Sequence, residues 1–120
     1  MSVSVCEERE ARGNVYLATC PCRDLLDVVS GKWSALVIGA LAGGPLRFGV
    51  LQGRVGGVSA KVLTATLRRL EGFALVDRVV YAAVPARVEY SLTAAGLAAV
   101  EPLAALCGWA EDHLRLVSAA

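Results

Sequence analysis

The sequence predicts a mainly α-helical domain with one small β-hairpin. Over most of the chain, apolar residues recur at the spacing of amphipathic helices. Two β-rich runs, 75–81 and 87–92, flank a short proline-containing stretch, which is typical of a hairpin. The 120 residues are 56% hydrophobic, which suits a single domain with its own core.

The N-terminal half is expected to form an arm followed by three helices. Residues 1–19 mix charges with glycine and asparagine without periodicity, so we expect an arm that is disordered or bound to a partner subunit. The helices are expected over residues 24–30, 33–41 and 48–52. Glycine or proline follows each of them within a few residues, and both residue types end helices. A very short strand at Leu46 and Arg47 is expected before the third helix.

A fourth helix, expected from Ala60 to Gly72, has two chemically different faces. Ser59 stands where a helix N-cap is needed. Apolar side chains gather on one face, at positions 63, 67 and 70. Short, polar or basic side chains gather on the opposite face, namely Lys61, Thr64, Ala65 and Arg68. One face is therefore expected to join the core while the other contacts a partner or solvent.

Two more helices are expected after the hairpin. Thr93 can cap the first, and Glu101-Pro102 can open the second, because proline is accepted in the first turn of a helix. The apolar stripe of this last helix comprises Leu103, Leu106, Cys107, Ala110, Leu114 and Val117. We divide the chain into an N-terminal arm (1–19), a winged helix-turn-helix domain (20–100) and a C-terminal dimerisation helix (101–120).

The order of the elements predicts DNA binding. Helices followed by a capped helix and a hairpin match a helix-turn-helix with a two-stranded wing, whose capped helix enters the major groove. Its polar side chains can reach bases and phosphates, and an arginine on the wing can reach the minor groove or backbone. The candidate DNA-contacting residues are Lys32, Ser59, Lys61, Thr64, Ala65, Arg68, Arg69 and Arg87.

The charge distribution agrees with this expectation. The net charge is +1, yet residues 32–87 carry eight basic and two acidic side chains, a local charge of +6. Residues 1–31 have three basic and five acidic side chains, and residues 88–120 have one and four. A basic middle between acidic ends fits a surface that faces a polyanion, although an uneven solvated surface would look the same.

Many residues in order resemble the HxlR-type regulators, a subgroup near the MarR-like winged-helix proteins. The matching positions are Cys20-Pro21, Leu26-Asp27, Gly31-Lys32-Trp33, Arg47-Phe48, Gly57-Val58-Ser59, Lys61, Leu63-Thr64, Leu67-Arg68, Leu70-Glu71, Leu75-Val76, Arg78, Tyr81, Val84-Pro85, the run 88–93 and Gly96. The resemblance covers about residues 20–113. The sequence departs from the family pattern at Val50, Gly56, Ala74 and Ala86.

The resemblance implies a homodimer that binds a pseudo-palindromic DNA operator through two copies of the capped helix. The absence of a membrane-spanning run or a secretory signal in the sequence leads us to expect a cytoplasmic protein. It also implies two possible signals. Some members respond to electrophiles or oxidants through the cysteine that matches Cys20, and others respond to small molecules. For the second case we consider a hydrophobic effector pocket lined by Trp33 and Trp109, although both tryptophans also suit a core or an interface.

The cysteines leave alternatives open. Cys20 precedes a helix start and Arg23, both of which favour a reactive thiolate, but Cys20 and Cys22 also fit inert thiols or part of a metal site. Cys107 fits a buried small hydrophobe, and Cys6 has no assignment. We expect no metal, cofactor or catalytic residue, and His113 fits a surface or interface position.

Other classes of protein are less consistent with the sequence. No apolar run reaches the roughly 20 residues that a membrane helix needs, and acidic residues stand where a secretory signal would be basic. A thiol-based redox enzyme would need a strand–helix–strand pattern around the cysteines. A winged-helix module that binds only proteins would be expected to carry more exposed aromatic residues. Both remain alternatives to a transcriptional regulator, which we expect to be a repressor.

Overall fold

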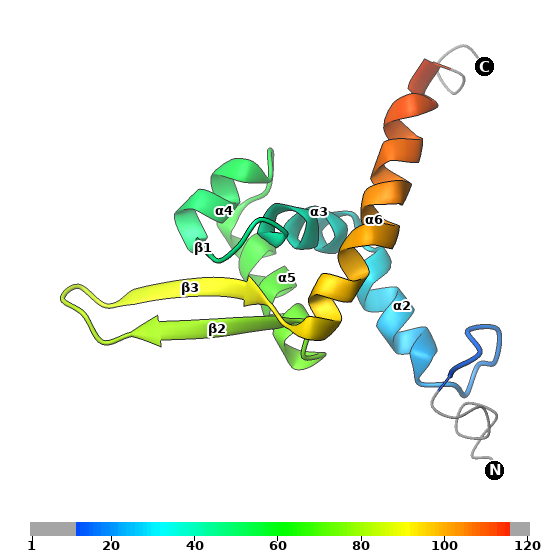
Figure 1. Cartoon of the computed structure of the whole chain (residues 1–120), viewed down its shortest axis with the longest axis horizontal. Helices are drawn as coiled ribbons and strands as arrows, with labels where there is room; N and C mark the ends of the chain where they lie inside the picture. The colour runs from blue at the N-terminus through cyan, green and yellow to red at the C-terminus, as the bar shows by residue number, and fades with distance from the viewer. Residues whose placement is uncertain (1–11, 116–120) are drawn as a thin grey trace.

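The structure, a computed structural model, describes residues 12–115. Its elements are α2 (Cys22–Ser30), α3 (Lys32–Leu41), β1 (Leu46–Arg47), α4 (Phe48–Arg54), α5 (Ala60–Gly72), β2 (Val76–Tyr81), β3 (Arg87–Leu92) and α6 (Ala94–Asp112). Figure 1 shows the helices gathered at one side and the β2–β3 hairpin extending from them. The predicted fold class, a mainly α-helical winged helix-turn-helix, is confirmed. Cys6 and Val117 lie outside the described residues.

The hairpin is joined to the helices by a third strand. The antiparallel sheet has the order β1-β3-β2, and β1 places Leu46 opposite Tyr90 and Arg47 opposite Glu89. The sequence indicated both the hairpin and the two-residue strand, but not that they pair. This pairing attaches the base of the hairpin to the start of α4, so the wing and the helix-turn-helix share one framework.

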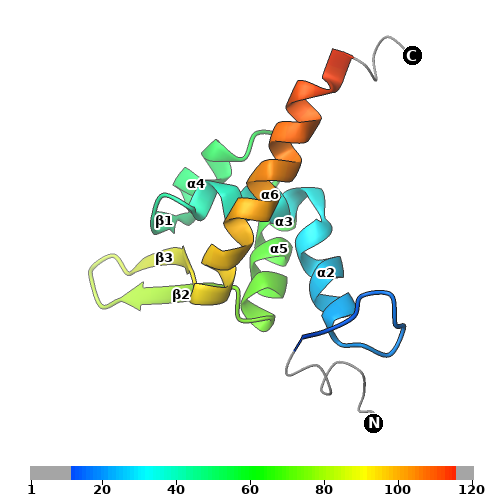
Figure 2. The ribbon, with the colours of Figure 1, turned by 45° about the vertical axis from the view of Figure 1, so that its right-hand side comes forward.

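The core lies around α3, which contacts α2, α4, α5, α6 and β3 and occupies the middle of the domain in Figure 2. Buried aliphatic side chains from different elements meet there, including Val37, Ile38 and Leu41 of α3, Leu63, Leu67 and Leu70 of α5, Leu51 of α4 and Leu103 of α6. Burial of such side chains contributes about 1.5–3 kcal/mol each. The apolar side of α5 is therefore held firmly in place.

The last helix differs from the prediction. Instead of two helices separated near residue 101, α6 is continuous and contains Pro102. Pro102 lacks an N–H group, so the carbonyl of Ala98 loses a helical partner, but both residues are exposed and water can replace it. Leu103 is buried and Val100 packs against the core, so the helix is held on both sides of the proline. The expected boundary between residues 100 and 101 consequently falls inside one helix.

The end of α5 is closed by backbone hydrogen bonds. The N–H of Leu75 donates to the carbonyl of Leu70, and that of Ala74 donates to Glu71, the pairing of a Schellman cap. Such a cap needs a left-handed residue, and Ala74 has φ of 59°. The helix ends at Gly72, as predicted, yet the position that favours glycine is occupied by alanine.

Replacing Ala74 by glycine is expected to raise the free energy of unfolding by about 0.5–1 kcal/mol, because glycine adopts positive φ without a Cβ clash. Urea denaturation followed by circular dichroism measures this change. Ala42→Gly is the matched control: Ala42 has φ of −61°, where glycine offers no relief, so it should be neutral or destabilising. Equal effects of the two substitutions would contradict the account of this cap.

Candidate nucleic-acid interface

The start of α5 is defined by the turn that precedes it. Gly57 has φ of 84°, which allows the chain to reverse after α4. The Ser59 hydroxyl then accepts a hydrogen bond of 3.1 Å from the N–H of Val62. Ser59 therefore caps the helix and holds its N-terminus in position.

The two faces expected for α5 are present. Leu63, Leu67 and Leu70 are buried, and the Thr66 hydroxyl is used inside the helix, donating to the carbonyl of Val62. On the other side, Lys61, Ala65 and Arg68 are exposed and Thr64 is half-buried. These four side chains form the polar face of α5. It combines two cations, a hydroxyl and a small side chain on a surface that the core leaves open.

Arg69 behaves differently from its neighbour Arg68. Its Nη2 lies 3.2 Å from Oδ2 of Asp27, so the side chain is directed toward α2. Both side chains are more than half exposed, and such pairs stabilise a fold only slightly. The contact directs Arg69 away from the polar face of α5, although the sequence analysis placed Arg69 among the candidate DNA-contacting residues.

A hollow of about 200 Å³ lies between α5 and the hairpin. It is lined by Thr64, Leu67, Arg68, Glu71, Arg78 and Tyr90. Nε of Arg78 lies 3.4 Å from Oε2 of Glu71, which fixes this arginine between the helix and β2. Arg78 was not among the predicted site residues, although it flanks the hairpin in the sequence. Only the register, which pairs Arg78 with Tyr90, brings it beside Arg68.

The outer part of the wing presents Arg87. It pairs with Tyr81 across the hairpin, and its guanidinium lies 5.6 Å from the centre of the Tyr81 ring. Nη1 of Arg87 is also 4.0 Å from Oε2 of Glu89, a distance at the limit of an ion pair. Val84 at the tip is fully exposed. The wing therefore offers a cation supported by an aromatic ring near an open tip.

Lys32 and the two tryptophans occupy separate environments. Nζ of Lys32 lies 4.5 Å from the centre of the Trp33 ring, and Trp33 is half-buried against the core. Trp109 is 57% exposed on α6 and stacks on His113 with ring centres 5.1 Å apart. Neither tryptophan lines the hollow between α5 and the hairpin or the larger cavity beside α6.

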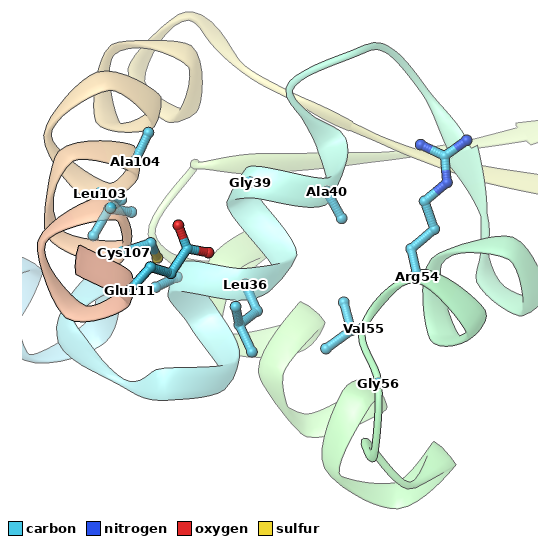
Figure 3. Close-up of a pocket in the computed structure, with 12 residues that line it drawn as sticks. Leu36, Gly39, Ala40, Arg54, Val55, Gly56, Leu103, Ala104, Cys107 and Glu111 are labelled. Atoms are coloured by element: carbon cyan, nitrogen blue, oxygen red, sulfur yellow. The ribbon is translucent and has the colours of Figure 1, made fainter. Parts of the chain in front are cut away.

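A cavity of about 440 Å³ opens instead between α3, the end of α4 and α6 (Figure 3). Its walls are largely aliphatic, with Leu36 and Leu103 on facing helices, Cys107 on α6, and Arg54 and Glu111 as charged residues. This lining does not include Trp33 or Trp109, the residues expected to line an effector pocket.

The cysteines around the start of α2 lie close together. Cys20 is 3% exposed, and its sulfur accepts a hydrogen bond of 3.4 Å from the N–H of Asn14. Nε of Arg23 donates to the carbonyl of Val15, so this arginine anchors residues 12–19 on α2. Within residues 12–115 no group of three or more metal-ligating side chains is found, and no helix is long and apolar enough to cross a membrane.

A family model described as HxlR-like helix-turn-helix matches residues 28–118. The chain belongs to this family. The HTH-type transcriptional regulator YtfH of Escherichia coli is 41% identical to this HxlR-type chain over 102 residues, covering 85% of the chain and 81% of YtfH. The predicted resemblance is confirmed.

Solved structures agree with this family. A transcriptional regulator YtfH from Salmonella typhimurium matches with a TM-score of 0.81 and 41% identity, covering 90% of this chain and 96% of that one. The redox regulator HypR in its reduced form matches with a TM-score of 0.75 and 31% identity, covering 83% and 99%. The HxlR-type chain is thus a helix-turn-helix transcriptional regulator rather than an enzyme.

Proposed function

We propose that this HxlR-type regulator represses transcription by binding a pseudo-palindromic DNA operator as a homodimer in the cytoplasm. The observation that carries the proposal is the polar face of α5, which lies opposite a face buried in the core. A helix held in this way can enter the major groove of B-DNA, which is about 12 Å wide.

Each exposed residue has a role that suits its chemistry. Arg68 and Lys61 donate hydrogen bonds to guanine edges or phosphates, and the Thr64 hydroxyl donates or accepts a hydrogen bond. The small side chain of Ala65 allows the helix to approach the bases closely. Arg78, beside Arg68 in the hollow, adds a phosphate contact from the wing. Lys32, at the start of α3, contacts the phosphate backbone of the DNA. We assign Arg69 no base contact, since Asp27 holds it toward α2.

Dimerisation through α6 follows from its exposed apolar side chains. Leu106 and Trp109 of α6, and Leu114 just beyond its end, are each more than half exposed. The C-terminal part of α6 extends away from the domain in Figures 1 and 2. Closed two-fold pairs are the commonest oligomers, and a second α6 would cover these side chains. The two copies of α5 would then face half-sites about one DNA turn apart.

An electrophoretic mobility shift with the region upstream of the gene itself tests the proposal. A retarded complex that survives competition by unrelated duplex supports an operator-binding regulator. If unrelated duplex abolishes the complex, or if no complex forms, the result would instead favour a winged-helix module that recognises a protein partner.

Arg87→Ala is expected to weaken binding to all DNA sequences by the same factor, because Arg87 contacts the DNA backbone or the minor groove. The slope of log K against the logarithm of the salt concentration should decrease in magnitude by about one. Fluorescence anisotropy titrations at several salt concentrations measure the slope. Arg87→Lys keeps the charge and should keep the parental slope. Loss of affinity confined to one operator base with an unchanged slope would show that the wing reads sequence.

We further propose that Cys20 carries a signal. HypR is described as a redox regulator, and Cys20 lies where residues 12–19 meet α2. A change at this sulfur would move the N-terminal segment and, through the dimer, the spacing of the two α5 helices. The alternative is a small hydrophobic effector bound near α6, in the cavity of Figure 3 or beside Trp33 and Trp109 after dimerisation.

One measurement separates the two signals. A mild oxidant or a quinone is expected to release the reduced parent from its operator and to leave Cys20→Ser bound, because only the parent has the reacting sulfur. Anisotropy of labelled operator reports the release. Equal release of both proteins, or of neither, would remove Cys20 as the sensor and favour the effector pocket.

A further inference from the structure

The hollow between α5 and the hairpin combines opposite charges. Arg68 comes from α5 and Arg78 from β2, and the carboxylate of Glu71 lies three residues beyond Arg68 on the same side of α5. Nε of Arg78 lies 3.4 Å from Oε2 of Glu71, whereas Arg68 forms no ion pair within residues 12–115. Two cations and one anion therefore line the hollow, which leaves it one net positive charge.

The wall of the hollow on the hairpin side is held in place by the sheet. Arg78 pairs with Tyr90, and Tyr90 pairs with Leu46 of β1, so the three residues form one row across the three strands. Side chains directly opposite each other in antiparallel strands lie on the same face of the sheet. Tyr90 and Leu46 pack against the core. Arg78 therefore extends toward α5 from a fixed strand position.

The hollow lies where a DNA backbone would pass. The proposed function places α5 in the major groove and the wing at the adjacent minor groove. In B-DNA a phosphodiester backbone separates these two grooves, so this backbone has to cross the angle between α5 and the hairpin. Arg68, Arg78 and the Thr64 hydroxyl line this angle, and all three can donate hydrogen bonds to phosphate oxygens. Glu71, by contrast, repels a phosphate.

We infer that this hollow is a subsite for one backbone phosphate and that Glu71 limits its affinity. The inference rests on the proposed function, because it requires α5 in the major groove. Glu71 neutralises one of the two arginines, so the subsite attracts a phosphate with the charge of a single cation. Contacts to phosphate carry no base information, so the carboxylate weakens binding to operator and to unrelated duplex by the same factor. Glu71 thus determines how tightly DNA is held.

The opposite role, in which Glu71 strengthens binding by positioning Arg78, is outweighed by the charge of Glu71. The Arg78 side chain is 54% exposed and that of Glu71 is 28% exposed, and ion pairs this exposed restrain their partners only weakly. A phosphate held by Arg78 would lie on the order of 6 Å from the carboxylate, where repulsion lowers affinity about threefold in water and more where water is excluded.

Salt titrations of charge variants test the inference. Fluorescence anisotropy measures binding of the full chain to the region upstream of its gene and to an unrelated duplex of equal length, each at several salt concentrations. Glu71→Gln should bind both duplexes at least about threefold more tightly at low salt. The slope of log K against the logarithm of the salt concentration should steepen by about one, because one more cation replaces a DNA counterion.

A double-variant cycle separates the charge of Glu71 from a positioning role. Arg78→Gln leaves one cation and one anion in the hollow, so its slope should be shallower than the parental slope by about one. The combined variant, Glu71→Gln with Arg78→Gln, leaves Arg68 alone and should restore the parental slope. If Glu71 acted by positioning Arg78, each single variant would weaken binding and the combined variant would weaken it no further. That result would overturn the inference.

Two control variants test whether the effect is local. Asp77→Asn removes the same charge from the residue before Arg78, whose side chain lies on the opposite face of the hairpin, and should change affinity less than about twofold. Glu71→Asp keeps the carboxylate and should also stay within about twofold of the parent. An effect of Glu71→Gln no larger than that of Asp77→Asn would contradict the proposed role of Glu71.

The unrelated duplex separates this inference from the proposed function. If the parent prefers the upstream region but Glu71→Gln keeps the parental affinity and slope, the proposed function stands and the inference fails. If the parent shows no preference, the proposed operator binding fails, and the slopes on the unrelated duplex still decide the role of Glu71. If none of the proteins binds either duplex, the hollow holds no DNA phosphate and both fail.

Discussion

Leu106→Glu is expected to yield monomers and to weaken operator binding at least about 100-fold. Leu106 is 54% exposed on α6, near Trp109 and Leu114, where the second copy is proposed to pack. A carboxylate buried there without a partner costs several kcal/mol. A monomer also loses the simultaneous engagement of two half-sites, which accounts for affinity gains of about 10²–10⁴-fold.

Sedimentation velocity at micromolar concentration measures the assembly, and anisotropy measures the affinity. Ala95→Glu is the control. Ala95 is exposed in the first turn of α6, where a carboxylate interacts favourably with the helix dipole. It should remain a dimer that binds normally. A parent that sediments as a monomer would contradict the dimer account.

Arg68→Ala and Lys61→Ala should each weaken operator binding by about 1–3 kcal/mol, or roughly 5–150-fold, while the melting temperature stays near that of the parent. Both side chains are exposed on the polar face of α5 and neither forms an ion pair within residues 12–115. Loss of either therefore removes DNA contacts without disturbing the core. Anisotropy with the operator and with single-base variants gives the affinity and the base affected.

Arg69→Ala is the matched control for these variants. It removes the same charge one residue away, but Asp27 holds Arg69 toward α2, so affinity should fall less than about threefold. Parental affinity in both Arg68→Ala and Lys61→Ala, or equal losses in Arg68→Ala and Arg69→Ala, would show that another surface reads the DNA.

Local patterns predicted the elements well because one buried face leaves a periodic trace in the sequence. The burial of Leu63, Leu67 and Leu70, the Ser59 cap and the end of α5 at Gly72 all follow from spacing and residue type. The same local reasoning was wrong at Pro102. It treated proline as a helix start, whereas packing of residues on both sides maintains a single helix.

Features made by residues far apart in the chain were not predictable in this way. The Arg69–Asp27 pair joins two helices, and Arg78 reaches Arg68 only through the register of the hairpin. Trp33 packs against the core, whereas Trp109 is exposed on α6 and stacks on His113, so their shared apolar character does not place them in one environment. Helical periodicity contains no information on such pairings.

Hydroxyl-radical footprinting of the parent on its upstream region tests the central claim most directly. A homodimer that inserts two copies of α5 should protect two symmetric segments separated by about one helical turn, 10–10.5 base pairs, or a multiple of it. The half-sites should be inverted repeats, and at a protein concentration near the parental Kd Arg68→Ala should weaken both footprints together. A single protected segment, unrelated sequences in the two segments, or Arg68→Ala footprints as strong as the parental ones at that concentration would contradict the account.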